Sequence, residues 1–407
     1  MKAMGERTEP SKGRVEETPR TREGVPAPAQ EATARRGAGM WENLAWSIGP
    51  ILLGLILTTL ALLAVGANPV RAYTVMWKGA FGNAAQFSNV VSSWVPLALA
   101  SVGLLITFTA GLWNIGIEGQ IIMGAIFTAW TARTFDWPAE ALIPALFISG
   151  IIGGAAWALL AGVLKTYGHV HEIFGGLGLN FVATGVTLYL IIGPWKRAGI
   201  ASTSGTELFR PAAWLPTFPG GMAVGPIEIA VAVVSLVIVY FALRGTLWGL
   251  KLKAIGKNIR SAYWIGISTR LHLLGAFALC GAFAGMAGTV QAIGVWHRLI
   301  PAISGGYGYL GILVVLLSGF QAAGLAPVAF FFAAVSKGSV ALPLDLQLDS
   351  SLGGVLQGII VLLVILSQGV RARVQRAGAS ARIDSAVLAS PVGPTAAPVE
   401  ANENPPL

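Results

Sequence analysis

The segment Gly111–Gly124 contains the polar side chains of this sequence that are best suited to a functional role. It reads GLWNIGIEGQIIMG and places Asn114, Glu118 and Gln120 between long apolar stretches. A carboxyl group and two amides in apolar surroundings must be paired with other protein groups or hydrated by a cavity, because isolated polar groups are costly there. These three side chains are therefore candidates for a polar path or gate.

The helix that carries these residues is predicted to be interrupted. A continuous helix would place Asn114 and Glu118 four residues apart on one face, but four glycines between residues 111 and 124 weaken it. A broken helix that lines a polar cavity explains both features. In the alternative interpretation, Glu118 lies at the lipid–water boundary of a short cytoplasmic turn and only caps or pairs.

Four further polar residues are candidates for the same path. Asn180 lies inside an apolar run, so its amide must bond either to a neighbouring helix or to a substrate hydroxyl. Tyr307 and Tyr309 are expected at the outer start of a later span, and Gln291 near the outer end of the span before it. Their alternative role is packing.

A second polar cluster, His169-Val-His171-Glu172, contains residue types that can bind a metal ion. A His-x-His pair on a short loop offers too few ligands by itself, so we expect no metal and no cofactor. Glu172 is expected to be a solvated loop acid.

The composition is that of an integral membrane protein. Of the 407 residues 55% are hydrophobic and 11% charged, and the mean hydropathy is +0.70, whereas about a quarter of a soluble domain is charged. Long apolar runs in lipid form helices, because every backbone polar group must be satisfied internally. We therefore expect an all-α, polytopic membrane protein with about ten transmembrane helices. The runs are Leu44–Gly66, Val90–Gly111, Gly116–Thr131, Ala141–Leu164, Ile173–Ile192, Ile227–Leu243, Leu271–Ile293, Gly306–Gly319, Leu325–Val335 and Gly353–Ser367.

The distribution of charge predicts the orientation and the domains. Residues 244–270 carry six basic residues and no acidic one, so this loop is expected in the cytoplasm. Residues 1–40 and 371–407 are expected to be disordered cytoplasmic tails around a permease domain at 41–370. The net charge of +9 comes from residues that flank apolar segments, so we expect the lipid bilayer and no nucleic acid as a partner.

The basic loop contains a predicted docking helix. In Gly256–Ile267, GKNIRSAYWIGI, Asn258 is a good N-cap, and Ile259, Ala262, Tyr263 and Gly266 share one face of a short helix. Such a helix can dock in a groove of a soluble partner; alternatively, it lies on lipid headgroups. The sequence has no phosphate-binding loop of the form GxxxxGK[ST], so the chain is not expected to hydrolyse ATP.

Three segments resemble the permease subunits of ATP-binding-cassette importers for nucleosides and simple sugars, in the branched-chain amino acid and ribose-type family. The segment with the most specific pattern is GLWNIGIEGQIIMGA; the others are the docking segment and Gly305–Ile312, GGYGYLGI, with Leu179–Asn180 as a weaker echo. The resemblance covers roughly residues 44–370. The docking segment departs from the family pattern at Ile259, which replaces a proline, and at Arg260, Trp264 and Ile265.

The resemblance implies an assembly in the cell inner membrane (plasma membrane). Its parts are two permease subunits, identical or homologous, two cytoplasmic ATP-binding subunits and an extracytoplasmic substrate-binding protein. The resemblance also implies that a set of loop residues couples the permease to the ATPase, namely Gly256, Asn258, Ala262, Tyr263 and Gly266. A nucleoside is the expected substrate, with a simple sugar as the alternative. A different class, an ion-coupled secondary transporter, would use Glu118 as its proton carrier.

Overall fold

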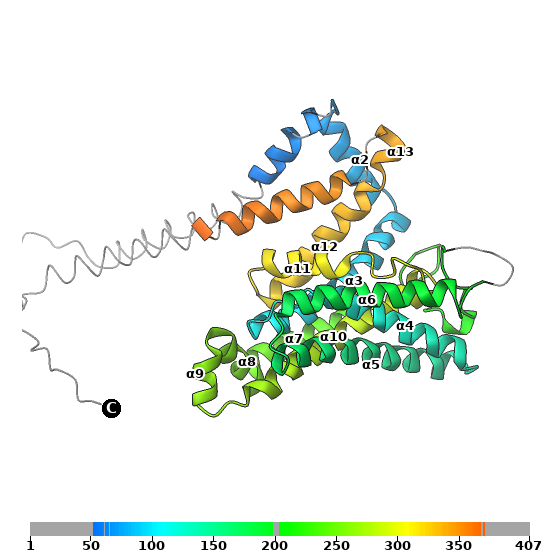
Figure 1. Cartoon of the computed structure of the whole chain (residues 1–407). Coiled ribbons are helices and arrows are strands. Elements are labelled where there is room, and N and C mark those ends of the chain that lie inside the picture. The colour runs from blue at the N-terminus through cyan, green and yellow to red at the C-terminus, as the bar shows by residue number, and fades with distance from the viewer. Residues whose placement is uncertain are drawn as a thin grey trace, which may run out of the picture. The chain divides into compact units, whose positions relative to one another are not determined.

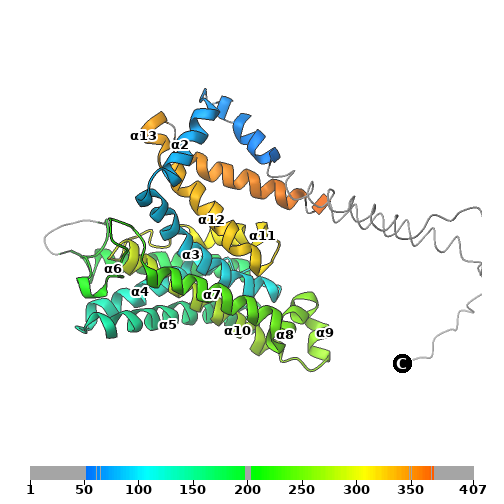
Figure 2. The same ribbon diagram turned by 180° about the vertical axis from the view of Figure 1, so that it is seen from behind.

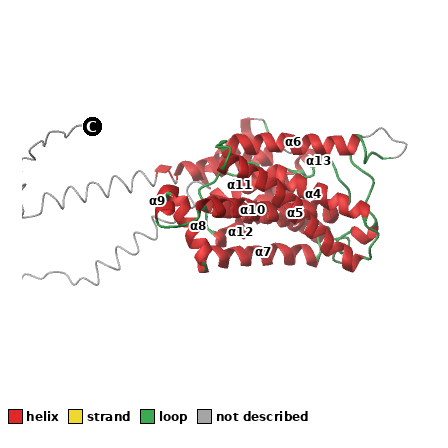
Figure 3. Ribbon diagram, turned by 60° about the horizontal axis from the view of Figure 1, so that its bottom comes forward, coloured by secondary structure: helices red, strands yellow, loops and turns green. Residues whose placement is uncertain are grey.

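A computed structural model describes residues 52–60, 62–64, 66–197, 203–347, 349, 351–367 and 369–370 (Figure 1). Within these residues every regular element is a helix, as Figure 3 shows. The tails predicted at 1–40 and 371–407 lie outside the described residues, as does the beginning of the first predicted span.

Within the described part of the chain, six helical segments are long and apolar enough to cross a membrane. The helix Leu52–Ala64 and α2 (Pro69–Phe81) meet at 113° and pass the same test as a pair. The prediction of an all-α, polytopic membrane protein is confirmed, whereas the sequence did not reveal α2. The six segments are α3 (Ala84–Thr109), α5 (Ala139–Thr166), α6 (Glu172–Ile192), α7 (Pro226–Gly245), Thr269–Val295 and Ala322–Leu346.

The helix α10 (Thr269–Val290) is the centre of the bundle and contacts α3, α4 (Ile117–Thr134) and α5. Glycines make the α5–α10 contact close: a Cβ on Gly285 would lie 2.0 Å from the carbonyl oxygen of Gly150, and one on Gly154 would lie 2.2 Å from that of Gly281. Only glycine fits at such a backbone-to-backbone contact. These two small-residue pairs therefore fix the helices that carry the site.

One end of the bundle is marked by α8 (Leu247–Lys257) and α9 (Ile259–Trp264), which follow α7 (Figures 1 and 2). These two short helices contact each other, and α8 also contacts the bundle through α3 and α7. They carry four of the six basic residues of the loop 244–270.

Two non-helical segments interrupt the bundle, at residues 110–116 between α3 and α4 and at residues 296–306 before α11 (Tyr307–Leu317). At 1.5 Å per residue α11 is roughly 16 Å long, about half of a hydrocarbon core of ~30 Å. Phe320, just beyond its end, lines one pocket with Thr109 and Arg244, from the C-terminal ends of α3 and α7, at the end of the bundle that carries α8. Hence α11 begins near mid-depth. The predicted outer position of Tyr307 and Tyr309 is wrong, because residues 296–306 turn back into the bundle.

Candidate functional site

Glu118, in the first turn of α4, holds the beginning of α11. Its side chain is 7% exposed, and its two carboxylate oxygens accept hydrogen bonds from the backbone N–H groups of Gly306 (3.0 Å) and Gly308 (2.8 Å). These N–H groups are the unsatisfied donors of a helix N-terminus, where a negative charge is stabilising. Glu118 therefore caps a half-length helix from inside the bundle, not at the lipid–water boundary.

Asn180, on α6, holds the beginning of α4 in the same way. Its Oδ1 accepts a hydrogen bond from the N–H of Gly119 (2.8 Å), and its Nδ2 donates to the carbonyl oxygen of Ile115 (3.0 Å). The N-cap position of α4 is Gly116, which has no side chain with which to cap the helix. Asn180 supplies the missing cap from α6. Of its two predicted roles, the described structure thus shows the bond to a neighbouring helix.

Asn114 and Gln120 form a reciprocal amide pair. Asn114 Nδ2 donates to Gln120 Oε1, and Gln120 Nε2 donates to Asn114 Oδ1, both at 3.1 Å. Asn114 Nδ2 also lies 3.1 Å from Cys280 Sγ on α10. Both amides are almost completely buried. The predicted break in this helix is present: α4 begins only at Ile117, and Asn114 lies in the non-helical segment before it, so it does not share a helix face with Glu118.

The two tyrosines at the start of α11 lie close to this junction. The Tyr307 hydroxyl interacts with Ser93 on α3 and with Gln291. The Tyr309 hydroxyl lies 3.4 Å from Asn180 Nδ2, and its side chain is 45% exposed. The structure thus brings all six predicted path residues to the interrupted starts of α4 and α11, and most of their polar atoms are bonded to each other or to the backbone.

Sequence reasoning missed Glu228, the third residue of α7. It is completely buried, and one carboxylate oxygen accepts a hydrogen bond from the N–H of Gly225 at 3.4 Å, while the other has no hydrogen-bond partner among the described residues. Gly294, in the π-helical turn Gln291–Val295, lies against it: a Cβ there would be 2.3 Å from Glu228 Oε1. The available signal was an acid inside the apolar run IEIAV.

Glu172 is not the solvated acid that the sequence predicts. It is 8% exposed, and it forms an ion pair with Lys165 at 2.5 Å across the turn between α5 and α6. The Nδ1 of His171 lies 3.8 Å from the same carboxylate. Among the described residues no three His, Cys, Asp or Glu side chains come together as a metal site.

The predicted docking helix is present as α9, and Asn258 caps it by accepting a hydrogen bond from Ser261 N–H at 3.0 Å. Gly266 lies beyond its end at φ +85°, where the N–H groups of Gly266 and Ile267 bond back to the carbonyls of Tyr263 and Ala262. This is the Schellman arrangement that ends helices with a left-handed glycine. The prediction that Gly266 lies on the helix face is therefore wrong.

The exposed side chains of this segment differ from the predicted set. Ala262 is 2% exposed and packs into the chain's own core, so its side chain does not face outward. Tyr263, Trp264 and Ile265 are 65%, 79% and 73% exposed. Three adjacent large apolar side chains on a charged loop form a surface suited to a partner, which we call the α9 tip.

A direct backbone contact joins the docking segment to the interrupted segment before α4. A Cβ on Gly256 would lie 2.2 Å from the carbonyl oxygen of Thr109 and 3.1 Å from the nitrogen of Gly111. Gly111 itself has φ +77°, which favours glycine. The backbone of α8 at Gly256 thus packs directly against the beginning of the segment that leads to Glu118.

Comparison with known proteins identifies the family. Residues 86–365 match the family model described as the permease component of the branched-chain amino acid transport system. The chain belongs to this family. It is therefore a multi-pass membrane permease component of ATP-binding-cassette importers, and the resemblance drawn from its motifs is confirmed.

The relatives include permeases for sugars and for nucleosides. The chain is 30% identical to the glucose permease TsgB13 of Haloferax volcanii, over 82% of this chain and 90% of the relative. It is 28% identical to the guanosine permease NupP of Bacillus subtilis (79% and 92% covered) and 26% to the nucleoside permease NupB of Lactococcus lactis (71% and 82%). In each organism a second permease also matches, at 24%, 22% and 22% identity. No solved structure matches.

Proposed function

We propose that this chain is the permease subunit of a nucleoside importer in the plasma membrane, driven by ATP hydrolysis in separate cytoplasmic subunits. The contact of Gly256 with Thr109 and Gly111 carries the proposal, because it links a partner-facing loop to the bonded starts of α4 and α11. The α9 tip is the surface that the ATPase subunit contacts. Two of the three similar relatives named above are permeases for guanosine or nucleosides, which favours a nucleoside over a sugar.

The second permease subunit of the proposed importer is a homologous chain and not a second copy. Three organisms each contain two relatives, and the identity to this chain differs consistently between the two: 30% against 24%, 28% against 22%, and 26% against 22%. This chain accordingly corresponds to one member of such a pair. An extracytoplasmic binding protein delivers the substrate from the opposite side.

The mechanism follows from the contacts. Closure of the ATPase pair moves α9 and α8, and the glycine contact transmits this movement to residues 110–116. There the capping bonds of Asn180 and Glu118 tie the start of α4 to α6 and α11, so the three helices move together. Asn114, Gln120, Tyr307 and Tyr309 complete the polar junction, which opens on one side of the membrane at a time.

Uptake is expected to need the ATPase partner and to ignore the proton gradient. The test is uptake of radiolabelled guanosine or glucose into proteoliposomes that contain both permeases, with and without the ATPase subunits, a binding protein and a protonophore. ATP-dependent guanosine uptake that resists the protonophore is the expected result. Preferred glucose uptake would assign the sugar alternative. Uptake by the chain alone that collapses with the protonophore would establish a secondary transporter instead.

Replacing Gly266 separates two roles of this residue. If Gly266 only supplies the left-handed turn, Gly266→Asn keeps function because Asn tolerates this conformation, whereas Gly266→Val loses it through strain of about 1–2 kcal/mol or more. If the missing side chain is needed for close contact with the ATPase, both variants fail. A Cβ at Gly266 meets nothing within 4 Å in this chain, so the Asn side chain causes no clash within the permease itself. Co-purification with the ATPase and coupled uptake of the two variants therefore distinguish the two roles.

A further inference from the structure

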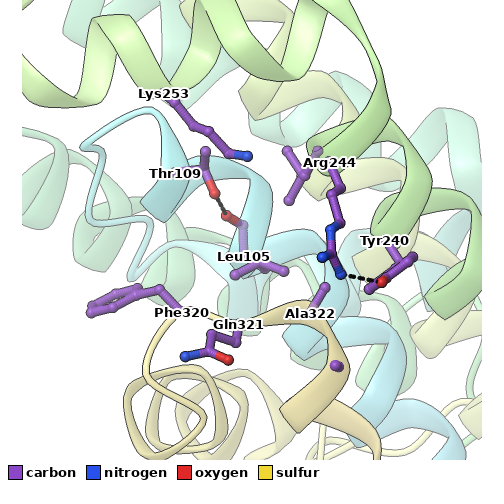
Figure 4. A pocket seen from close by; sticks show the side chains of 10 residues that line it. Leu105, Thr109, Tyr240, Arg244, Lys253, Phe320, Gln321 and Ala322 are labelled. Atoms are coloured by element: carbon purple, nitrogen blue, oxygen red, sulfur yellow. Dashed lines mark hydrogen bonds between the residues drawn. The ribbon is translucent and has the colours of Figure 1, made fainter. Parts of the chain in front are cut away.

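A pocket at the cytoplasmic end of the bundle contains two cationic side chains and no acidic one. Its volume is about 350 Å³, and it lies between the C-terminal ends of α3 and α7, helix α8 and the turn that joins α11 to α12 (Ala322–Ser339). Arg244 and Lys253 extend into it from α7 and α8, toward Gln321 on the opposite wall (Figure 4).

Neither cation has a counter-charge in the part of the chain that the structure describes. The ion pairs there join Lys165 and His171 to Glu172, and Arg210 to Asp136. Arg244 instead donates a hydrogen bond to the uncharged hydroxyl of Tyr240 and lies over its ring, 5.5 Å from the centroid. Two positive groups that face one pocket repel each other, so an anion between them would be stabilising.

The other walls of the pocket suit an amphipathic anion. The first turn of α12 lines one side, and its N-cap residue Gln321 forms no side-chain cap, so backbone N–H groups of this turn can donate to an anion in the pocket. Leu105 and Phe320 supply apolar surface, and Phe320 is 47% exposed at the rim. The pocket thus offers cationic and apolar contacts together.

We propose that this pocket binds the phosphate group of an anionic phospholipid from the cytoplasmic leaflet. Guanidinium and ammonium groups are strong phosphate donors, and basic pockets between helices on the cytoplasmic side fit lipid headgroups. The leaflet brings this phosphate to the depth at which the helices end. Soluble phosphate shares the chemistry but would make no use of the apolar side chain of Phe320 at the rim.

The test uses the purified full-length chain and counts bound lipid by native mass spectrometry after exchange into phosphatidylglycerol or phosphatidylcholine. The pocket variant is Arg244→Gln with Lys253→Gln. The matched control is Lys251→Gln with Lys257→Gln, which removes the same charge from exposed residues of α8 outside the pocket. Thermal unfolding is followed with short-chain forms of each lipid and with inorganic phosphate.

We expect the wild-type chain to retain phosphatidylglycerol. The apparent affinity for this lipid should fall about tenfold or more in the pocket variant but not in the control. Arg244→Lys, which keeps the charge, should retain binding and exclude misfolding as the cause. Equal binding of both lipids, or equal loss in both double variants, would overturn the proposal. Stabilisation by inorganic phosphate without a lipid preference would assign a soluble anion instead. Loss of ATPase co-purification without any change in bound lipid would assign the cations to an acidic partner surface.

Discussion

Glu118→Leu is expected to abolish transport. The leucine would leave the N–H groups of Gly306 and Gly308 without acceptors inside the bundle, and each costs about 1–3 kcal/mol. A total of about 2–6 kcal/mol reduces the population of the intact junction at least roughly thirtyfold. ATP-driven uptake in proteoliposomes, at matched expression, measures the effect.

Glu118→Gln distinguishes the structural role from a proton-carrying one. The amide keeps one oxygen for one of the two N–H donors and turns an N–H₂ group toward the other, so uptake should be reduced but clearly above that of the leucine variant. If the charge itself carried protons, Gln would be as inactive as Leu. Glu140→Leu, at an exposed acid in the first turn of α5, is the control and should transport normally.

Gly256→Ala is expected to uncouple ATP hydrolysis from transport. The added Cβ would lie 2.2 Å from the Thr109 carbonyl oxygen, so α8 must move away from the segment that leads to α4. Uptake should fall at least about tenfold while the assembled ATPase continues to hydrolyse ATP. Simultaneous measurement of ATP hydrolysis and uptake in one preparation gives the coupling ratio.

Gly275→Ala is the matched control for this substitution. Gly275 is also a helical glycine near the cytoplasmic end, on α10, but a Cβ there meets nothing within 4 Å. Both variants gain about 1 kcal/mol of helix propensity, so only the contact differs between them. Normal coupling in Gly256→Ala would contradict the proposed transmission path.

The sequence by itself determined the class of the protein and the local features of its loop. Low charge and long apolar runs specify membrane helices, because the bilayer leaves backbone groups no other partner. Asn258 was recognisable as an N-cap, since the bond to Ser261 spans three residues. The importance of Glu118 followed from the cost of an acid in apolar surroundings. Each of these inferences depends only on neighbouring residues and their solvent.

Only the tertiary structure decided what the polar residues bond to. Glu118 pairs with N–H groups 188 and 190 residues away, and Asn180 with one 61 residues away. Every residue except proline carries a backbone N–H, so no side-chain pattern marks these donors. The burial of Ala262 and the unpaired oxygen of Glu228 likewise depend on which helices pack beside them. The mid-depth start of α11 follows from the return of residues 296–306 into the bundle, which long-range contacts determine and local sequence does not.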